Sequence, residues 1–415
     1  MPQNRSSGIP TTWRDWKAAF SSLSIPNYRW FWFSTTASFA AMQMQMVVRG
    51  WLVFEMTESP LALGIVSAGA GAFIILFSLF GGVVADRVDK RNLLAATQLF
   101  AGIATLVVAI LITTGLIAFW HLVVASVVNG LILAFRLPVR QAIIPELVES
   151  NQVMNAVALN SSAMNLNRIV APALAGVLVG VMGIDSVYYL MVLCYFASAI
   201  LMIRVPSTGK PIQATGTTFR REIAEGITYV RKSPELWGLL LTATIPILFG
   251  MPYQMLMPGF VAEVLGRQAS ALGFLMASVG IGALMGSLLV ASLGDYKYKG
   301  RLLFGGAVVF GLTLIIFALS RNFYLSMGVL VIVGAASASY MAVNTTLLMM
   351  NSEERMRGRV MSIYMVTIGL YPLGVLPAGA IAEYTGITLP VAVGGAIMVV
   401  FILTMMLINP RLIKL

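Results

Sequence analysis

Two stretches of the chain, residues 42–94 and 251–303, have similar sequences with identical residues at the same spacing. They align without a gap at a shift of 209 residues, and 15 of their 53 positions are identical. Each stretch reads as two apolar segments followed by a short charged loop, which indicates two copies of one membrane-embedded unit. Tandem halves of this kind are related by a pseudo-twofold axis along the membrane normal, with a solute site between them. The repeat therefore constrains the fold before any single residue does.

The composition places the chain in lipid. Hydrophobic residues make up 59% of it and charged residues only 10%, whereas a soluble domain has about 25% charged residues. A single cysteine, Cys194, and a single histidine, His121, exclude a disulfide framework and a His/Cys metal site. We expect no metal and no cofactor. The polar N-terminus lacks the pattern of a cleaved signal peptide, so we expect the first span to be retained.

Apolar runs long enough to cross a membrane define the organisation of the chain. They fall near residues 29–55, 60–85, 93–115, 119–145, 152–183, 186–204, 236–263, 269–293, 302–319, 324–350, 358–384 and 387–408. The sequence thus predicts an all-α membrane protein of twelve spans in two six-helix bundles. The expected divisions are an N-terminal segment, a first bundle, a linker, a second bundle and a tail, at residues 1–28, 29–204, 205–235, 236–408 and 409–415.

Basic residues predict the orientation. With the N-terminus inside, 21 of the 27 Lys and Arg residues fall in cytoplasmic segments, and the outer loops hold only Arg267 and Arg321. This asymmetry follows the positive-inside rule. We therefore expect a multi-pass protein of the cell membrane with both termini in the cytoplasm. The net charge of +11 then faces anionic lipid headgroups and gives no reason to expect nucleic-acid binding.

The linker contains an amphipathic segment. Phe219, Ile223, Ile227 and Val230 form an apolar stripe at helical spacing, flanked by basic residues. We expect a helix that lies on the membrane surface. A regulatory or lipid-sensing role is the alternative interpretation.

The strongest local motif is the charged loop between the second and third spans. It contains Gly82, Asp86, Arg87, Lys90 and Arg91, and a degenerate copy with Asp295 follows the eighth span. A carboxylate at Asp86 can accept hydrogen bonds from the N-terminus of a neighbouring helix, where the amide groups and the dipole favour an anion. Such a contact can exist in one conformation and break in another. The plainer interpretation is a charged loop that only sets topology.

This loop resembles the cytoplasmic signature of the major facilitator superfamily, with Asp89 at a position where the general pattern has Gly. Further motifs resemble the third drug:proton antiporter group, which includes macrolide exporters and the enterobactin exporter. They are Pro26-Asn27-Tyr28-Arg29, Trp51-Leu52-Val53, residues 138–148, residues 165–176 and Arg357-Gly358-Arg359. The resemblance implies alternating access and export of amphipathic organic compounds coupled to proton influx. In the fifth span, Ala171-Pro172 replaces the usual Gly-Pro pair, so the helix kink at Pro172 remains while the support for antiport weakens.

Ionisable residues at membrane depth are costly and usually functional. Arg168, Arg136 and Arg49 lie within spans, and no acidic residue lies at a comparable depth. Arg168 is either a structural residue satisfied by carbonyl groups or Asn165, or a cavity residue that attracts an anionic substrate group. The family pattern matches Arg168 and favours the structural role. Arg136 has no such match and is the better candidate for substrate contact.

Proton coupling usually requires a carboxylate that exchanges protons. Only Asp86 and Glu146 are candidates, and both lie near the cytoplasmic surface. We therefore expect Asp86, Arg140 and Glu146 to form a conformational latch that biases the inward-open state against the outward-open state.

The repeat also suggests the cavity. Methionine adapts to many shapes and glutamine adds adaptable hydrogen bonds. The predicted lining is Met42, Gln45, Met46, Asn129, Arg136, Asn165, Arg168, Tyr253, Gln254, Met255, Tyr340, Asn344, Tyr364 and Tyr371. The alternative is that these residues are packing or lipid-facing residues. Such a lining suits an amphipathic organic molecule better than a sugar or an inorganic ion.

Other classes of function fit the sequence less well. The chain has no Gly-x4-Gly-Lys-Ser/Thr loop for a nucleotide-driven pump. It also lacks a cluster of catalytic groups at membrane depth, so we do not expect an enzyme. The alternatives are a transporter similar to lysophospholipid flippases of the same superfamily and a non-transporting receptor or scaffold. An importer is a further alternative, and we expect a monomer.

Overall fold

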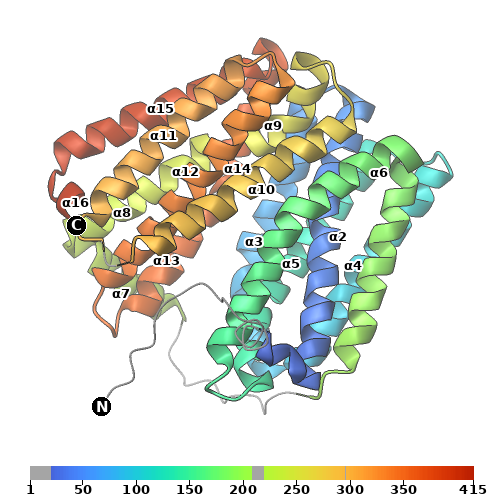
Figure 1. The fold of residues 1–415 in the computed structure, drawn as a ribbon, viewed down its shortest axis with the longest axis horizontal. Coiled ribbons are helices and arrows are strands. Elements are labelled where there is room, and N and C mark those ends of the chain that lie inside the picture. The colour runs from blue at the N-terminus through green and yellow to red at the C-terminus, as the bar shows by residue number, and fades with distance from the viewer. Residues whose placement is uncertain (1–19, 208–218, 295) are drawn as a thin grey trace, which may run out of the picture.

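The computed structural model describes residues 20–207, 219–294 and 296–415. For residues 78–83, 85–87, 137–138, 141 and 219–224 it describes the backbone alone. The regular elements in these ranges are all helices. They form two bundles that stand side by side, one from each half of the chain (Figure 1).

The N-terminal bundle is built from five long helices. A short 3-10 helix, η1, covers Ser21–Ser24, and the long helices are α2 (Pro26–Thr57), α3 (Pro60–Arg87), α4 (Lys90–Thr113), α5 (Phe119–Leu147) and α6 (Val153–Ile203). Both α2 and α3 begin with proline, whose missing N–H is not needed in the first turn of a helix. The Ser59 hydroxyl also accepts a hydrogen bond from the Ala62 N–H at 3.1 Å, which caps the start of α3.

Helix α6 is 51 residues long and turns sharply at one residue. Gly183 has a φ of 85°, outside the right-handed helical region, and glycine adopts this conformation without steric penalty. The turn lies at the end of the predicted span 152–183 and three residues before the predicted span 186–204. Helix α6 therefore contains two predicted membrane-spanning segments, one on each side of the turn at Gly183.

The C-terminal bundle begins with an interrupted helix. Its first parts are α8 (Pro234–Ile245), the π-helix η2 (Pro246–Gly250), α9 (Tyr253–Gly259) and the π-helix η3 (Phe260–Val264). Proline donates no backbone hydrogen bond, so Pro246, Pro252 and Pro258 prevent one uninterrupted α-helical pattern. The remaining helices are α10 (Ala269–Ser292), α11 (Lys299–Leu319), α12 (Phe323–Met350), α13 (Arg357–Gly369), α14 (Tyr371–Thr385), α15 (Thr388–Ile408) and α16 (Arg411–Lys414).

Ten helical stretches in the described residues are long and apolar enough to cross a membrane. One of them is α6, which turns at Gly183, and another combines α13 and α14. Helix α2 is not among the ten, although it has 32 residues. Counting α6 twice and adding α2 would give the twelve expected spans, and that number remains a prediction.

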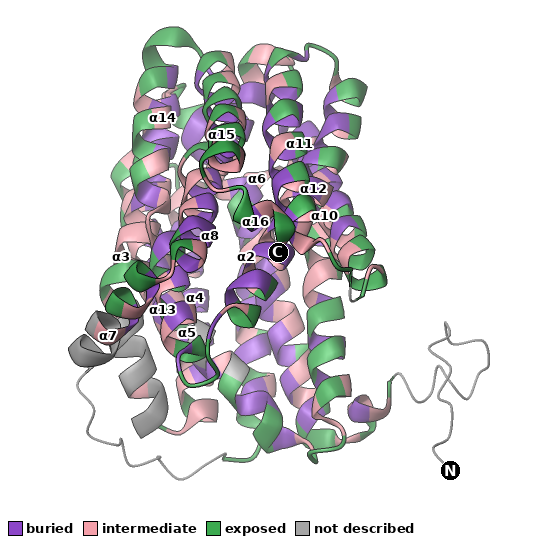
Figure 2. Ribbon diagram, turned by 90° about the vertical axis from the view of Figure 1, so that its left-hand side faces the viewer, coloured by how far each residue is buried: buried purple, intermediate pink, exposed green. Residues whose placement is uncertain are grey.

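The outward faces of the bundles are apolar. Val107, Leu193 and Val400 are each more than half exposed, whereas large residues such as Tyr28, Phe304 and Phe310 are completely or almost completely buried. Exposed positions follow the outer helix faces and buried positions follow the interior (Figure 2). Apolar side chains on both faces are typical of helices surrounded by lipid.

Two pairs of helices make the most extensive contacts between the bundles. Helix α6 packs against α10, and α3 packs against α14. At the first contact, a Cβ added to Gly176 would lie 2.7 Å from the Ala269 carbonyl oxygen and 2.9 Å from the Gly273 Cα atom. The two backbones therefore meet directly, as small residues permit in membrane proteins.

The inter-bundle contact covers only part of the helix length. Along α3 the close approaches run from Pro60 opposite Gly379 to Ile75 opposite Gly369. Beyond this region, Met365 on α13 and Leu288 on α10 are each more than half exposed. We call the end that carries η1 and α16 the terminal end and the opposite end the distal end. The bundles are joined toward the distal end, and their helices diverge toward the terminal end (Figure 1).

The linker helix α7 (Phe219–Lys232) packs on the C-terminal bundle. Arg359 of α13 forms an ion pair with Glu225 at 2.6 Å, and the Glu353 N–H donates to the Tyr229 hydroxyl at 3.1 Å. Val230 is 1% exposed. This part of the linker is therefore held against protein, and whether its other side lies on a membrane stays a prediction.

Candidate substrate cavity and conformational contacts

One face of α2 carries the first group of predicted cavity residues. Met42, Met46 and Arg49 follow each other at spacings of four and three residues, so they form one stripe along the helix. Met42 is half-buried and Met46 is 40% exposed. Gln45 is only 5% exposed, so its amide faces protein and not lipid.

Arg136 of α5 lies against this stripe. Its guanidinium Nη2 lies 3.5 Å from the Met42 sulfur, and the side chain is 5% exposed. A thioether is a weak acceptor, so this contact satisfies little of the hydrogen-bonding capacity of a guanidinium. The structure thus brings Met42 and Arg136 together at the candidate site.

The second group gathers in the C-terminal bundle around a small cavity. Its walls come from α8, η2, α11, α12 and α13, and its free volume of about 10 Å³ has room for about one water molecule. The lining residues are Ala243, Pro246, Ile247, Met251, Phe310, Ser337, Tyr340, Met341, Asn344 and Tyr364. Three of the predicted residues, Tyr340, Asn344 and Tyr364, therefore share one cavity.

Hydrogen bonds to α8 hold two of these side chains in place. The Tyr340 hydroxyl donates to the Thr242 carbonyl oxygen. The Asn344 amide donates to the Leu239 carbonyl oxygen at 3.1 Å and to the Thr242 hydroxyl at 3.2 Å. The Asn344 Oδ1 atom is buried and has no partner. An unpaired carbonyl oxygen beside a cavity can accept a hydrogen bond from water or from a ligand.

The remaining predicted residues of α9 and α14 have different environments. Tyr253 is 2% exposed and Met255 is 6% exposed, so both are packed inside the protein. Gln254 is half-buried and donates to the Tyr253 hydroxyl at 3.3 Å. Tyr371, at the start of α14, is half-buried against the apolar core.

Three polar residues lie apart from the small cavity. The Asn129 amide donates to the Ala125 carbonyl oxygen of its own helix at 2.8 Å. Asn165 is half-buried and Arg168 is exposed, and both lie on the first part of α6. The Arg168 carbonyl group approaches Gly280 of α10, so this residue lies where the bundles meet. Pro172, the predicted kink residue, is buried at the same contact.

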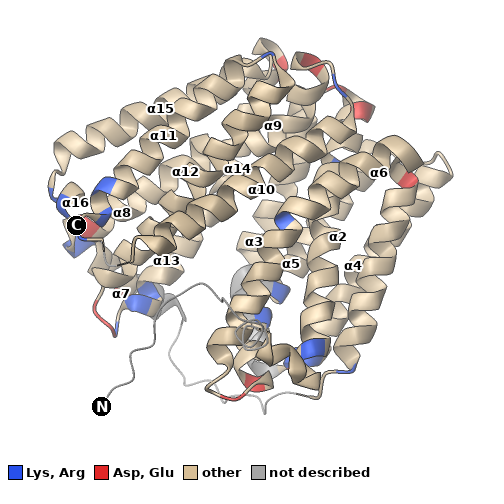
Figure 3. Ribbon diagram, viewed as in Figure 1, with Lys and Arg blue, Asp and Glu red and all other residues tan. Residues whose placement is uncertain are grey.

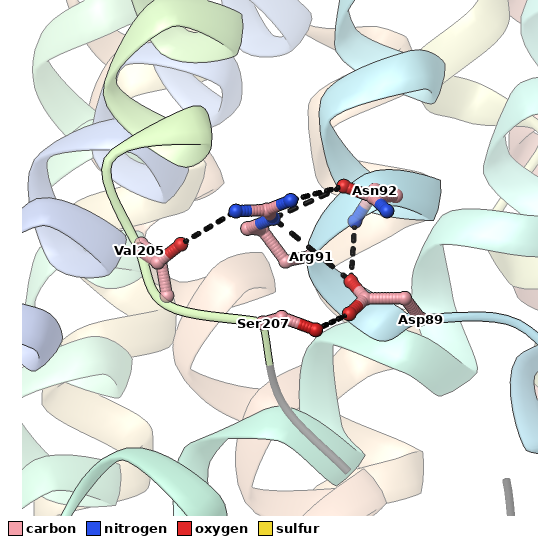
Figure 4. A network of polar contacts seen from close by, with 5 residues as sticks. All are labelled: Asp89, Arg91, Asn92, Val205 and Ser207. Carbon is pink, nitrogen blue, oxygen red and sulfur yellow. Dashed lines mark hydrogen bonds and ion pairs between the residues drawn. The ribbon is translucent and has the colours of Figure 1, made fainter. Parts of the chain in front are cut away.

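The loop before α4 is tied to the end of α6 (Figure 4). The Asp89 carboxylate accepts from the Asn92 N–H at 2.9 Å, which caps α4, and from the Ser207 hydroxyl. Arg91 donates to the Val205 carbonyl oxygen at 3.4 Å. Asp89 therefore has a local structural role at a position where the general family pattern has glycine.

The structure describes only some of the side chains of the predicted latch. Lys90 of α4 forms an ion pair with Glu146 of α5, which joins two helices of the same bundle. Arg140 is half-buried, and its Nε atom has no hydrogen-bond partner. Asp295 and the side-chain environments of Gly82, Asp86 and Arg87 lie outside the described residues. The latch thus stays a prediction.

A second contact between the bundles lies at the distal end. The Glu383 carboxylate of α14 accepts from the Ser59 hydroxyl at 2.7 Å and from the Leu61 N–H at 3.1 Å. These donors surround the N-terminus of α3, where the helix dipole favours a negative charge. We call this contact the Glu383 clasp. Sequence reasoning did not identify it, because residues 59 and 383 are too far apart in sequence for any local pattern to relate them.

Charge is distributed unevenly along the helices (Figure 3). Most acidic positions lie near helix ends, at the Gly183 turn or in loops, whereas basic positions also occur along the helices of the N-terminal bundle. Within the described residues, no three His, Cys, Asp or Glu side chains are placed to hold a metal ion.

The fold is that of the major facilitator transporters. A bacterial homologue of the human lysosomal transporter Spinster, solved in an inward-facing and occupied conformation, superimposes with a TM-score of 0.74 at 14% identity. The alignment covers 92% of this chain and 96% of that chain. The chain belongs to the family described as transmembrane secretion effector, whose model matches residues 17–414.

Relatives with known roles extend over most of the chain. The staphyloferrin A transporter of Staphylococcus aureus is 23% identical, covering 92% of this chain and 96% of its own length. Macrolide efflux protein A of Streptococcus pyogenes is 24% identical, with 86% and 90% covered. The enterobactin exporter of Shigella boydii is 23% identical, with 74% of each chain covered. The resemblance to exporters of the major facilitator superfamily is thereby confirmed.

Proposed function

We propose that this protein exports amphipathic organic compounds across the cell membrane by alternating access, with coupling to proton influx. The observation that carries the proposal is the asymmetric contact between the bundles, which meet backbone to backbone toward the distal end and separate toward the terminal end. A structure closed at one end and open at the other is one of the two states that alternating access requires. If the termini are cytoplasmic, as the basic residues predict, this state is open to the cytoplasm.

The residues around the candidate site support an organic substrate. Methionine, tyrosine and amide side chains come from both bundles, and they combine apolar contact area with adaptable hydrogen bonds. The named roles of the relatives, staphyloferrin A transport, macrolide efflux and enterobactin export, also concern organic molecules. We propose that this protein acts on the same broad class.

Inverted membrane vesicles test the proposed direction and coupling. Vesicles from a bacterial strain without its own exporters, with and without this protein, are energised so that their interior is acidic, and uptake of a fluorescent amphiphile is followed. We expect accumulation only in vesicles that contain the protein, and we expect a protonophore to abolish it. Accumulation that persists without a gradient would contradict proton coupling. If a panel of antibiotics and amphiphiles gave no accumulation and no resistance, the export proposal itself would be wrong.

A further inference from the structure

Two arginines in the N-terminal bundle, Arg49 of α2 and Arg136 of α5, have no acidic partner among the described residues. Arg136 is 5% exposed, and in the described part of the chain its polar contact is the Met42 sulfur at 3.5 Å. The Nη1 atom of Arg49 is buried and has no hydrogen-bond partner.

Two tyrosines from the second part of α6 complete this group. Tyr188 and Tyr195 are each 1% exposed. Tyr195 lies near both guanidinium groups, and Tyr188 lies near that of Arg49. The Tyr188 hydroxyl is buried without a hydrogen-bond partner. We call Arg49, Arg136, Tyr188 and Tyr195 the Arg49–Arg136 cluster.

The cluster holds positive charge and unused hydrogen-bond donors. Guanidinium groups only donate hydrogen bonds, and a phenol can donate one. A buried charge without a partner is costly, and within a membrane such residues usually mark a substrate pathway. The partner that these groups lack among the described residues is therefore an acceptor with negative charge.

The cluster borders an exposed part of α2. Met46 is 40% exposed and lies between Met42, which contacts Arg136, and Arg49 on the same stripe of the helix. A ligand that reaches Met46 is thus within one helical turn of Arg49. Its apolar part would contact a methionine, which adapts to varied shapes.

We propose that the Arg49–Arg136 cluster binds a carboxylate group of the substrate, so that the substrate class is an anionic amphiphile. This proposal rests on the proposed function and narrows its substrate. A carboxylate can accept two parallel hydrogen bonds from one guanidinium, and it can accept a further bond from the Tyr188 hydroxyl. Arg136 was predicted from the sequence as a substrate contact, whereas the structure adds Arg49 and the two tyrosines to the site.

Thermal unfolding of the purified protein in a neutral detergent tests the charge preference. The probes are naphthaleneacetate, phenylbutyrate and dodecanoate, each paired with its uncharged primary amide. We expect the Tm of the wild type to rise with at least one carboxylate and not with its amide. Arg136→Gln and Arg49→Gln should weaken that binding about tenfold or more, because a charge-assisted pair is lost. Arg136→Lys should retain part of the affinity, since it keeps the charge but not the forked geometry.

The ligand-free protein gives a second readout. Arg136→Gln removes a buried charge that has no described partner, so its Tm without ligand should equal or exceed that of the wild type. If Arg136 instead stabilised the fold through a structural contact, the substitution would lower the Tm. Arg321→Gln, in an exposed loop position, changes the net charge equally and serves as the control. The proposal is overturned if no carboxylate raises the Tm, if the amides act equally well, or if both glutamine variants bind as the wild type does.

Failure of this proposal and failure of the export function are distinguishable. Carboxylate binding without vesicle accumulation of any amphiphile would contradict export and leave the cluster assignment intact. Accumulation that is the same in the wild type and in Arg136→Gln would contradict the cluster assignment and leave export intact.

Discussion

Asn344 has a structural role in the described conformation and is also one of the predicted cavity residues. Its amide nitrogen donates to two groups on α8, and its Oδ1 atom remains unpaired beside the small cavity. The donated bonds hold α12 against α8, and the Oδ1 atom can still accept a hydrogen bond. Because the side chain is 1% exposed, each of these bonds is shielded from water.

The Asn344→Leu variant should be less stable than the wild type by about 0.6–2 kcal/mol, since it loses two inter-helix bonds while keeping the side-chain volume. Differential scanning fluorimetry in detergent measures the change. Asn129→Leu is the matched control, because Asn129 bonds only to its own helix, at the Ala125 carbonyl oxygen. An Asn344→Leu Tm equal to that of the control would contradict the role assigned to these bonds.

At the residue scale, the sequence indicates which kinds of side chain could line a site, but it does not indicate the direction in which each side chain points. Gln45 and Met46 are adjacent and were predicted as cavity residues together, yet Gln45 is 5% exposed and Met46 is 40% exposed. In a membrane helix nearly all residues are apolar, so the periodic pattern that reveals the buried face of a soluble helix is weak. The pairing of Tyr340 and Asn344 with α8 also depends on tertiary packing, which no local pattern records.

At the element scale, the Glu383 clasp joins α14 to the N-terminus of α3. Ser59 both caps α3, through the Ala62 N–H, and donates to Glu383. The helix start and the contact between bundles therefore share one hydroxyl group. Opening the distal end requires these hydrogen bonds to break, so the clasp favours the conformation described here.

Glu383→Leu should shift the protein toward opening at the distal end. A carboxylate at a helix N-terminus contributes about 0.5–2 kcal/mol, which corresponds to roughly a twofold to thirtyfold change in the conformational equilibrium. Spin labels at Leu116→Cys and Arg321→Cys, in a Cys194→Ser background, measure the separation of the bundles. Glu383→Gln should have a smaller effect because it keeps an acceptor oxygen. Glu55→Gln, at the same end of the molecule, serves as the charge control, and equal distance distributions for all variants would contradict the clasp.

Most helix bounds could be predicted from the sequence, because a change from apolar to polar residues coincides with the end of a span. The fourth span, predicted at 119–145, corresponds to α5 at Phe119–Leu147. The internal breaks could not be predicted in the same way. Pro246, Pro258 and Pro372 are present in the sequence, but proline can kink, shift or end a membrane helix depending on its neighbours.

At the scale of the whole molecule, the two bundles contact each other mainly along α6–α10 and α3–α14. The distal contact is made largely by backbone atoms at Gly64, Gly176, Gly273 and Gly379. The tandem repeat in the sequence predicted two related halves, and the fold agrees with that prediction. Which end is closed could not be predicted, since one sequence must support both conformations of a transporter.

A disulfide across the distal contact should stop transport. The Cβ position at Gly64 lies 3.7 Å from the Gly379 Cα atom, and the Cβ position at Gly379 lies 3.5 Å from the Gly64 Cα atom. The two positions therefore face each other closely, and because a Cβ at Gly379 would lie 2.9 Å from the Pro60 carbonyl oxygen, the backbones must shift slightly to accept both cysteines. In a Cys194→Ser background, Gly64→Cys with Gly379→Cys should transport when reduced and lose most activity when oxidised. Each single cysteine variant reports the effect of the added side chain alone. Full activity in the oxidised double variant would show that the distal end need not open.

The glycine contact between α6 and α10 has a consequence for how this protein can diversify. At Gly176 and Gly273 this contact consists of main-chain atoms, whereas the proposed ligand-binding side chains lie on α2, α5, α8 and α12. If the proposed function holds, substitutions on those four helices can change which compound is bound while the backbone contact between the bundles keeps its shape. Selectivity can then evolve, or be engineered, independently of the packing between the bundles.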